Sequence, residues 1–240
     1  MIIKLKLKQN KKWDTHPSIR FLLIMYDDAV KKLQKNVEEH LSTAPVCHDF
    51  SHVLRVLQNA KIIGEKESLK NEVNMDVVIM AALLHDIARP EEIASKGEVC
   101  HAAAGAAQVP TYLKLCGITD PKIVMAVSNC VLKHRFRNGI TPTTIEEKII
   151  YDADKLDAIG AIGIGRAFHF AGRIGARVHN SQEDAMNSDA YSIEDSAYRE
   201  YLVKLRFIAD KTLTETGTEI AQKRVEFMEN FFTQLNSEVF

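Results

Sequence analysis

A histidine and an aspartate, His85 and Asp86, stand next to each other at the end of the apolar run Val77–Leu84. A helix that is apolar nearly all round lies in a protein interior, where a carboxylate without a partner costs several kcal/mol. No cation precedes the pair in this run, and Arg89 comes only after it. A divalent metal would satisfy both side chains, because imidazole and carboxylate are ligands for Zn, Mn, Fe, Co and Ni. The simpler alternative is a core histidine beside an aspartate, stabilised by the helix C-terminus.

Two further groups of polar side chains favour the metal. His48 and His52 are one helical turn apart, so they share a face of the helix expected there. Downstream, Asp152, Asp154 and Asp157 place three carboxylates on one expected helix. Aspartate is a poor helix former, so three of them in mid-helix indicate a role beyond solubility.

Apolar residues at helical spacing predict helices along almost the whole chain, and no alternating run is long enough to build a sheet. The expected helices are Ser18–Val37, 49–63, Val77–Ala88, 101–116, Lys122–Phe136, Thr144–Asp157, Ser192–Asp210 and Thr212–Asn236. Asp76 and Asp120 are expected N-caps, and Thr144 with Glu147 resembles a capping box. Pro90 is expected to end the third helix and Pro110 to kink the fourth.

The five glycines between Gly160 and Gly175 are open to two interpretations. A phosphate-binding loop is disfavoured, because no strand precedes the glycines and no Walker lysine follows them. Glycines that let helices approach closely are the preferred interpretation. Residues 176–191 are expected to form a surface loop. The simplest organisation is an accessory arm at 1–17 and one all-α helical-bundle domain at 18–240.

The composition excludes several classes of protein. With 31 basic and 32 acidic residues interspersed, the net charge is −1, and nothing indicates long nucleic acid or an anionic membrane as a partner. No run approaches the roughly 20 apolar residues that span a bilayer. The four cysteines form no CxxC pair, which favours free thiols in a reducing compartment over a thiolate zinc site. We therefore expect a cytoplasmic protein.

The order His52, His85–Asp86, Asp154 resembles the HD-domain phosphohydrolase superfamily, which is named for its metal ligands. The segment 48–56, HDFSHVLRV, resembles the HDxxHxxRV opening of one branch of small hydrolases. The segment 152–164, DADKLDAIGAIGI, resembles a longer motif of the same branch. Some members of that branch cleave nucleoside triphosphates to the monophosphate and pyrophosphate.

The resemblance implies an all-helical fold with one divalent ion held between central helices by His52, His85, Asp86 and Asp154. The ion could be Mn, Mg, Ni, Co, Zn or Fe. Relatives with a second metal add further histidines, and His101 and His134 stand where such ligands often occur. The sequence departs from the branch at two places. A lysine or histidine usually follows the HD pair, and here either Arg89 takes its role or no such cation is present. A late aromatic-rich segment, 198–205, lacks its histidine, and inference of the substrate from relatives weakens if this segment shapes the pocket.

The implied activity is hydrolysis of a nucleotide or another small phosphoester or phosphoanhydride by metal-activated water. Asp86 is expected to connect metal and water, while Asp157 or Asp152 could orient a ligating histidine. His101 and His134 are candidate proton donors or phosphate contacts, with ordinary structural histidines as the alternative. The candidate phosphate-binding cations are Arg55, Lys155 and Arg89.

Two rival functions remain open at this stage. Some proteins of this fold hold two irons and act as oxygenases, which would require His101 and His134 as ligands. A non-catalytic nucleotide-binding module is the other. The sequence leaves monomer and homodimer open.

Overall fold

The computed structural model describes residues 17–42, 50–135 and 140–239. The expected all-α class is confirmed, since no strand occurs in these three ranges. The helices are α1 Pro17–Leu41, α2 Phe50–Glu67, α3 Met75–Leu84, α4 Arg89–Ala94, α5 His101–Leu115, α6 Pro121–Lys133, α7 Ile145–Leu156, α8 Gly160–Arg173, α9 Gln182–Asn187, α10 Ala197–Val203 and α11 Glu215–Val239. Two short 3-10 turns, η2 Leu205–Phe207 and η3 Ala209–Lys211, precede α11. The expected arm at 1–17 lies almost wholly outside the described residues.

Helix α3 forms the centre of the first group of helices, α1 to α7. It packs against α1, α2, α6 and α7. Its residues from Ala81 to Leu84 have no exposed surface, so it is buried all round, as its composition predicts. The polar residues that follow α3, beginning with His85, therefore lie among the helices that surround it.

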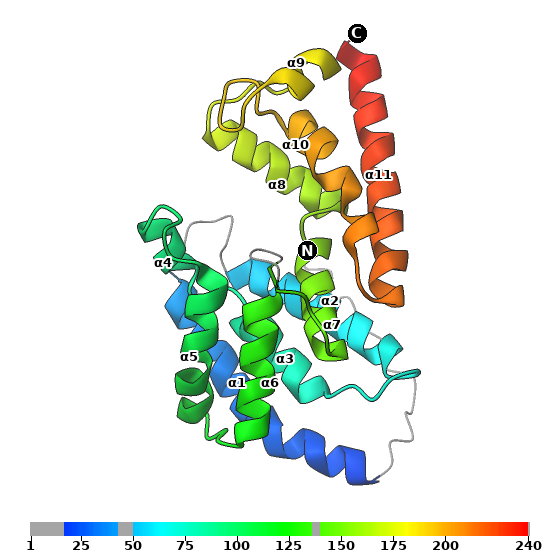
Figure 1. Ribbon diagram of the computed structural model, residues 1–240. Coiled ribbons are helices and arrows are strands. Elements are labelled where there is room, and N and C mark those ends of the chain that lie inside the picture. The colour runs from blue at the N-terminus through cyan, green and yellow to red at the C-terminus, as the bar shows by residue number, and fades with distance from the viewer. Residues whose placement is uncertain (1–16, 43–49, 136–139, 240) are drawn as a thin grey trace, which may run out of the picture.

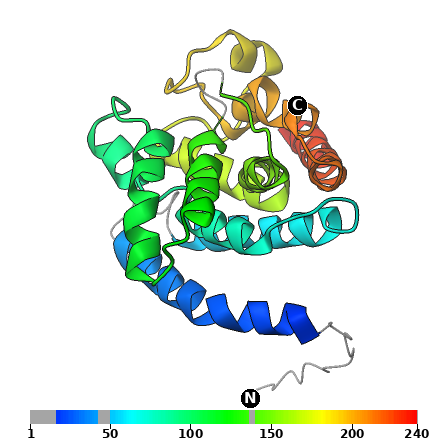
Figure 2. The ribbon, with the colours of Figure 1, turned by 60° about the horizontal axis from the view of Figure 1, so that its bottom comes forward.

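The second group of helices, α8 to α11, lies beyond α7 and forms the upper part of the molecule in Figure 1. Its core is aromatic: Phe232 of α11 has 1% exposure and its ring lies 4.6 Å from that of Tyr201 in α10. Figure 2 shows α11 beside α7 and α8. The two groups thus meet along α7 and the first half of α11.

Buried polar contacts fasten α11 to the first group. Asp152 of α7 accepts hydrogen bonds from the backbone N–H of Leu213 and Thr214 and from the Thr214 hydroxyl. Gly217 packs against it, and a Cβ on this glycine would lie 2.4 Å from Asp152 Oδ2. Asp152 therefore stabilises the start of α11 from a different helix. Its carboxylate bonds this segment and not a histidine, so the expectation that Asp152 could orient a ligating histidine is not met.

The segment around the HD pair differs from the sequence prediction. The helix ends at Leu84, its N-cap is Asn74 and not Asp76, and His85 is its C-cap. Pro90 does not end this helix. It lies in the first turn of α4, where the missing N–H costs nothing because that position has no intrahelical acceptor. The prediction of a helix through Ala88 was wrong for this reason, and His85 and Asp86 consequently lie in a turn.

Other predicted boundaries divide into confirmed and corrected ones. Asp120 caps α6, and Thr144 with Glu147 forms a complete capping box on α7. Pro110 lies inside one continuous helix, α5. The glycine-rich stretch is mainly helix α8, and residues 176–191 contain the short helix α9. Ser192 does not open a helix, since α10 begins at Ala197 after its N-cap Ser196.

The structure also bears on membrane-spanning helices and on the cysteines. Among the described helices, none combines the length and the apolar character required to cross a membrane. Cys100, Cys116 and Cys130 are free cysteines, whereas Cys47 lies outside the described residues.

Candidate metal centre

The centre of the site is a pair of histidines from different helices whose Nε2 atoms point at each other. His52 of α2 and His85 at the end of α3 place their Nε2 atoms 3.2 Å apart. The Nδ1 atom of His52 lies 2.7 Å from Asp157 Oδ2, and that of His85 lies 2.8 Å from the carbonyl oxygen of Ala82. Both partners are pure acceptors, so each Nδ1 carries the proton and donates it. The Nε2 atom of His85 therefore presents a lone pair to the Nε2 atom of His52.

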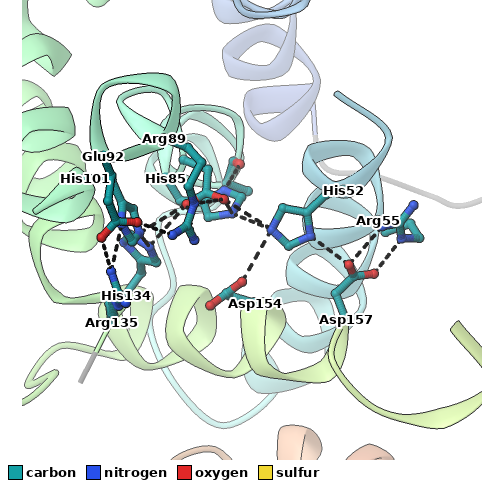
Figure 3. Close-up of polar contacts among 12 residues, drawn as sticks. His52, Arg55, His85, Arg89, Glu92, His101, His134, Arg135, Asp154 and Asp157 are labelled. Carbon is teal, nitrogen blue, oxygen red and sulfur yellow. Dashed lines mark hydrogen bonds and ion pairs between the residues drawn. The ribbon is translucent and has the colours of Figure 1, made fainter. Parts of the chain in front are cut away.

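Two carboxylates complete this convergence of donor atoms. Asp86 Oδ2 lies 3.6 Å from His52 Nε2 and 4.0 Å from His85 Nε2, and Asp154 Oδ1 lies 3.5 Å from His52 Nε2. Ligands about 2.1 Å from a common ion are roughly 3.0 to 3.4 Å apart in octahedral or tetrahedral arrangements. His52, His85 and Asp86 lie close enough together to hold a metal ion after small shifts, and Asp154 adjoins this triad through its contact with His52. In Figure 3, dashed lines join His52 to Asp154 and, on the other side of its ring, to Asp157.

Helix ends reinforce the preference for a cation. His85 is the C-cap of α3, His134 the C-cap of α6 and Asp157 the C-cap of α7. A helix C-terminus carries about half a negative charge, so three of them directed at one site favour positive charge there. In α3 and α7, a buried leucine, Leu84 or Leu156, directly precedes the polar residue at the helix end.

A second cluster lies on the other side of Asp86. His101 and His134 have their Nε2 atoms 3.1 Å apart, and Asp86 Oδ1 lies 3.2 Å from the first and 3.8 Å from the second. His134 donates from Nδ1 to the carbonyl of Val131, and His101 Nδ1 lies 2.9 Å from Glu92 Oε2. Asp86 with His101 and His134 forms a second triad able to hold a metal ion, in parallel with the triad of His52, His85 and Asp86.

Burial keeps most of these imidazoles neutral. It lowers the pKa of His134 to about 3 and that of His101 to about 4, and it also lowers the pKa of His85. His52 differs, since hydrogen bonds to Asp154 and Asp157 outweigh its burial and raise its pKa to about 9. A neutral imidazole is the form that binds metal, so three of the four are ready for ligation at neutral pH.

Asp157 fixes the orientation of His52 and is itself held by two guanidinium groups. Arg55 donates from Nε to Oδ1 at 2.6 Å and from Nη2 to Oδ2 at 3.0 Å, and Arg166 donates to Oδ2 at 2.7 Å. These bonds outweigh the burial of Asp157 and keep its pKa below the usual value. Arg55 thus contacts the carboxylate that orients His52, and it is absent from the lining of the cavity beside the site.

A cavity of about 720 Å³ opens beside the cluster. The residues lining it include His52, His101, His134 and Asp154, together with several cations. Lys155, 2.8 Å from Asp154 Oδ2, and Arg89, whose Nη2 lies 3.2 Å from Asp86 Oδ1, both line the cavity. Of the three cations expected to bind phosphate, Arg89 and Lys155 therefore face the cavity. His48 lies outside the described residues.

Sequence reasoning missed two members of this site. Glu92 bonds His101, Arg89 and Arg135, and these contacts outweigh its burial and lower its pKa to about 2. The available signal was Pro90 followed by two glutamates, which marks a helix start. Arg166, the second guanidinium partner of Asp157, carried no local signal because the contact spans the α7–α8 turn.

Comparison with known proteins identifies the class to which this fold and site belong. A family model described as HD domain matches residues 49–159. The chain is also 32% identical to the Bacillus subtilis protein YpgQ over 198 residues, which cover 80% of this chain and 84% of YpgQ. The chain belongs to the HD-domain phosphohydrolase superfamily.

Solved structures support this assignment. The crystal structure of YpgQ in complex with ADP matches with a TM-score of 0.65 and 30% identity, covering 88% of this chain and 97% of YpgQ. An HD-superfamily hydrolase from Bacillus thuringiensis matches with a TM-score of 0.68 and 26% identity, over 88% of this chain and 97% of that one. A predicted HD-superfamily hydrolase from an uncultured Thermotogales bacterium matches with a TM-score of 0.64 and 27% identity, over 91% and 99% of the two chains.

Proposed function

We propose that this protein is a metal-dependent phosphohydrolase that cleaves a phosphoanhydride bond in a nucleotide. The observation that carries the proposal is the convergence of His52, His85, Asp86 and Asp154 at the edge of a cavity lined by cations. These four side chains would hold a divalent ion. When bound, such an ion supplies positive charge to the phosphoryl oxygens and lowers the pKa of water.

The protein's own residues would bind and orient the substrate. Lys155, Arg89 and Arg135 line the cavity and place positive charge where phosphate oxygens would lie. Asp157 keeps the Nδ1 proton on His52, so Nε2 remains directed into the site. His101 and His134, neutral at pH 7 and lining the same cavity, are within reach of a phosphate oxygen or leaving group.

The nucleotide part of the proposal has separate support. A relative that is 30% identical, YpgQ, has been crystallised with ADP. The cavity of about 720 Å³ lies within the size range of small-molecule sites and combines cations with apolar side chains such as Tyr151 and Ile208. A nucleotide needs both, because its phosphates are anionic and its base is largely apolar.

Activity and metal content of site variants test the proposal together. The purified protein, loaded in turn with Mn²⁺, Mg²⁺, Co²⁺, Ni²⁺, Zn²⁺ or Fe²⁺, is assayed against nucleoside di- and triphosphates. His85→Ala and Asp86→Ala are expected to abolish hydrolysis and lower bound metal, whereas His169→Ala, an exposed position on α8, keeps both. Full activity in either site variant contradicts the assignment. Tight nucleotide binding with no hydrolysis under any metal would favour a non-catalytic module.

The second triad favours a two-metal centre as a second candidate. Asp86 lies between the two pairs of facing imidazoles, so one carboxylate could serve an ion on each side. Two ions per chain would suit either a hydrolase or a diiron oxygenase. Metal analysis of wild type and His101→Ala counts the ions, and consumption of dioxygen by the iron-loaded protein separates the oxygenase from the hydrolase.

A further inference from the structure

A second cavity of about 710 Å³ adjoins the one beside the metal ligands. The two share a short stretch of wall made of Arg89, Arg135, Ala158, Arg166 and Lys204. Four of these five side chains are basic, and each is paired with a carboxylate in this structure. A phosphate chain that starts at the metal ligands could compete for these basic groups along the wall that the two cavities share.

Helix α8 forms one wall of the second cavity and leads away from the metal ligands. Arg166, Ala167, Phe170 and Arg173 all line the cavity and lie at helical spacing on one face. Arg166 contacts Asp157 at the near end. Phe170 follows four residues later, about 6 Å further along the helix axis at 1.5 Å per residue. With distance from the metal ligands, this wall therefore presents Arg166, then Phe170 and then Arg173.

Tyr191 also lines this cavity, where its ring contacts that of Phe170 edge to face, and its backbone has an unusual conformation. Its side chain is 76% exposed, and its ring lies 5.8 Å from that of Phe170 at an angle of 69°. Its backbone has a φ of +62°, a left-handed conformation that costs a bulky residue free energy. Asp195 is buried, with 6% exposure. Its Oδ2 accepts a hydrogen bond from the backbone N–H of Tyr191 at 2.7 Å, and its Oδ1 accepts one from Arg199 Nη1 at 2.9 Å.

Asp195 thus fixes the backbone of Tyr191, and the contact with Phe170 positions its exposed ring. An ordinary surface tyrosine has neither a strained backbone nor a buried carboxylate fixing it. Arg173 adds a guanidinium 5.4 Å from the Phe170 ring centre. Two aromatic rings with a neighbouring guanidinium form a surface on which a planar heterocycle can stack.

We propose that the second cavity binds the base of the nucleotide substrate against the aromatic surface formed by Tyr191 and Phe170, with the phosphates along the basic residues that the two cavities share. This inference rests on the proposed function and makes it more specific: the substrate is a nucleotide whose base lies on α8 and whose terminal phosphates reach the metal ligands. Stacking tolerates any base, so we expect modest discrimination among the four bases. An inorganic polyphosphate would leave the aromatic pair without a role.

Binding of ADP and of inorganic pyrophosphate, measured by calorimetry, tests the base site. Tyr191→Asn removes the ring while keeping a residue that tolerates the left-handed backbone. We expect it to weaken ADP binding by about tenfold or more and to leave pyrophosphate binding unchanged. Tyr191→Phe keeps the ring and is expected to keep wild-type affinity for both ligands. In steady-state assays, Tyr191→Asn raises KM for the nucleotide with little change in kcat.

The outcomes separate this inference from the proposed function. If the wild type hydrolyses a nucleotide and Tyr191→Asn has unchanged KM and unchanged ADP affinity, the base site is wrong and the hydrolase stands. If ADP affinity depends on Tyr191 but no metal yields hydrolysis, the base site stands and the hydrolase is wrong. Equal losses of ADP and pyrophosphate binding in Tyr191→Asn also overturn the base site, since they indicate a general disturbance.

Discussion

Each imidazole of the site owes its direction to the acceptor on its Nδ1 atom. His85 and His134 use carbonyls three residues earlier, at Ala82 and Val131, which the ends of α3 and α6 leave without intrahelical donors. His52 uses the carboxylate of Asp157. A charged acceptor makes the imidazole a stronger ligand than a carbonyl does. Asp157 is therefore the residue outside the expected ligands with the largest expected effect on metal binding.

Asp157→Asn tests whether the carboxylate of Asp157 strengthens metal binding through His52. The amide keeps the size of the side chain but removes the negative charge that holds the Nδ1 proton of His52 and the guanidinium groups of Arg55 and Arg166. We expect metal affinity to fall by roughly 10- to 100-fold. Competition with a chelator measures it for Mn²⁺. Asp210→Asn, at an exposed position, is the matched control. Equal affinity in Asp157→Asn and wild type would contradict the role.

Sequence alone brought His52, His85, Asp86 and Asp154 together as expected ligands, because their motifs are local and resemble those of a known family. It suggested Asp157 as an orienting residue and left Asp152 as an alternative. The contact of Asp157 with His52 distinguishes the two, and Asp152 instead binds the start of α11. Such partners could not be predicted, because which face of α7 meets α2 and which meets α11 depends on packing between distant segments.

Among the helices, α7 both carries site residues and binds its neighbours. Its final turns carry Asp154 and Asp157, Asp152 binds the start of α11, and Glu147 binds Lys133 of α6. Helix boundaries marked by side-chain caps were predictable, as at Asp120 and Thr144. Boundaries marked by proline were not, because Pro90 is equally compatible with the end of one helix and the first turn of the next. That ambiguity decided whether His85 and Asp86 lie in a helix or a turn.

Glycine replacements test how α11 is fastened. At Gly217 an added Cβ would meet Asp152 Oδ2 at 2.4 Å and Thr214 Oγ1 at 2.6 Å, so Gly217→Ala displaces the carboxylate that caps α11. We expect a loss of about 1 to 3 kcal/mol in the free energy of unfolding. Gly165, mid-helix in α8, has no atom within 4 Å of the added Cβ, and Gly165→Ala should gain about 0.5 to 1 kcal/mol. Urea denaturation measures both, and effects of the same sign would contradict the packing argument.

Glu147 makes the stability of α7 depend on pH. Bonds from Lys133 and the backbone of Thr143 and Thr144 outweigh its burial and keep its pKa below the ordinary 4.5. A lowered carboxyl pKa contributes stability above the unfolded-state pKa and loses it as pH falls through the folded-state pKa. Glu147→Gln should therefore cost about 1 to 3 kcal/mol at pH 7. The difference from wild type should stay constant down to about pH 5 and shrink below pH 4.5.

Urea denaturation across this pH range gives the comparison. Glu226→Gln, an exposed position on α11, is the control and should show no such dependence. A difference that grows as the pH falls would contradict the assigned direction of the Glu147 pKa.

At the scale of the whole molecule, the expected ligands come from α2, from the turn after α3 and from α7, and they meet only when these helices are packed. Metal binding must therefore stabilise the folded chain, because the unfolded chain offers no such cluster. At 100 times its dissociation constant, an ion adds about 2.7 kcal/mol. For a chain of this size that corresponds to a rise in Tm of roughly 5 to 10 °C.

Thermal unfolding with and without Mn²⁺ tests this linkage between site and fold. The wild type, freed of metal by a chelator, should gain the full shift in Tm on addition of Mn²⁺. Asp86→Asn, which removes the charge shared by both triads, should gain much less, because only Asp154 then supplies a carboxylate among the four expected ligands. His169→Ala, exposed on α8, should respond as the wild type does. An equal shift in Asp86→Asn would mean that Mn²⁺ stabilises the fold from somewhere else, and the helices around α3 would then meet for reasons of packing alone.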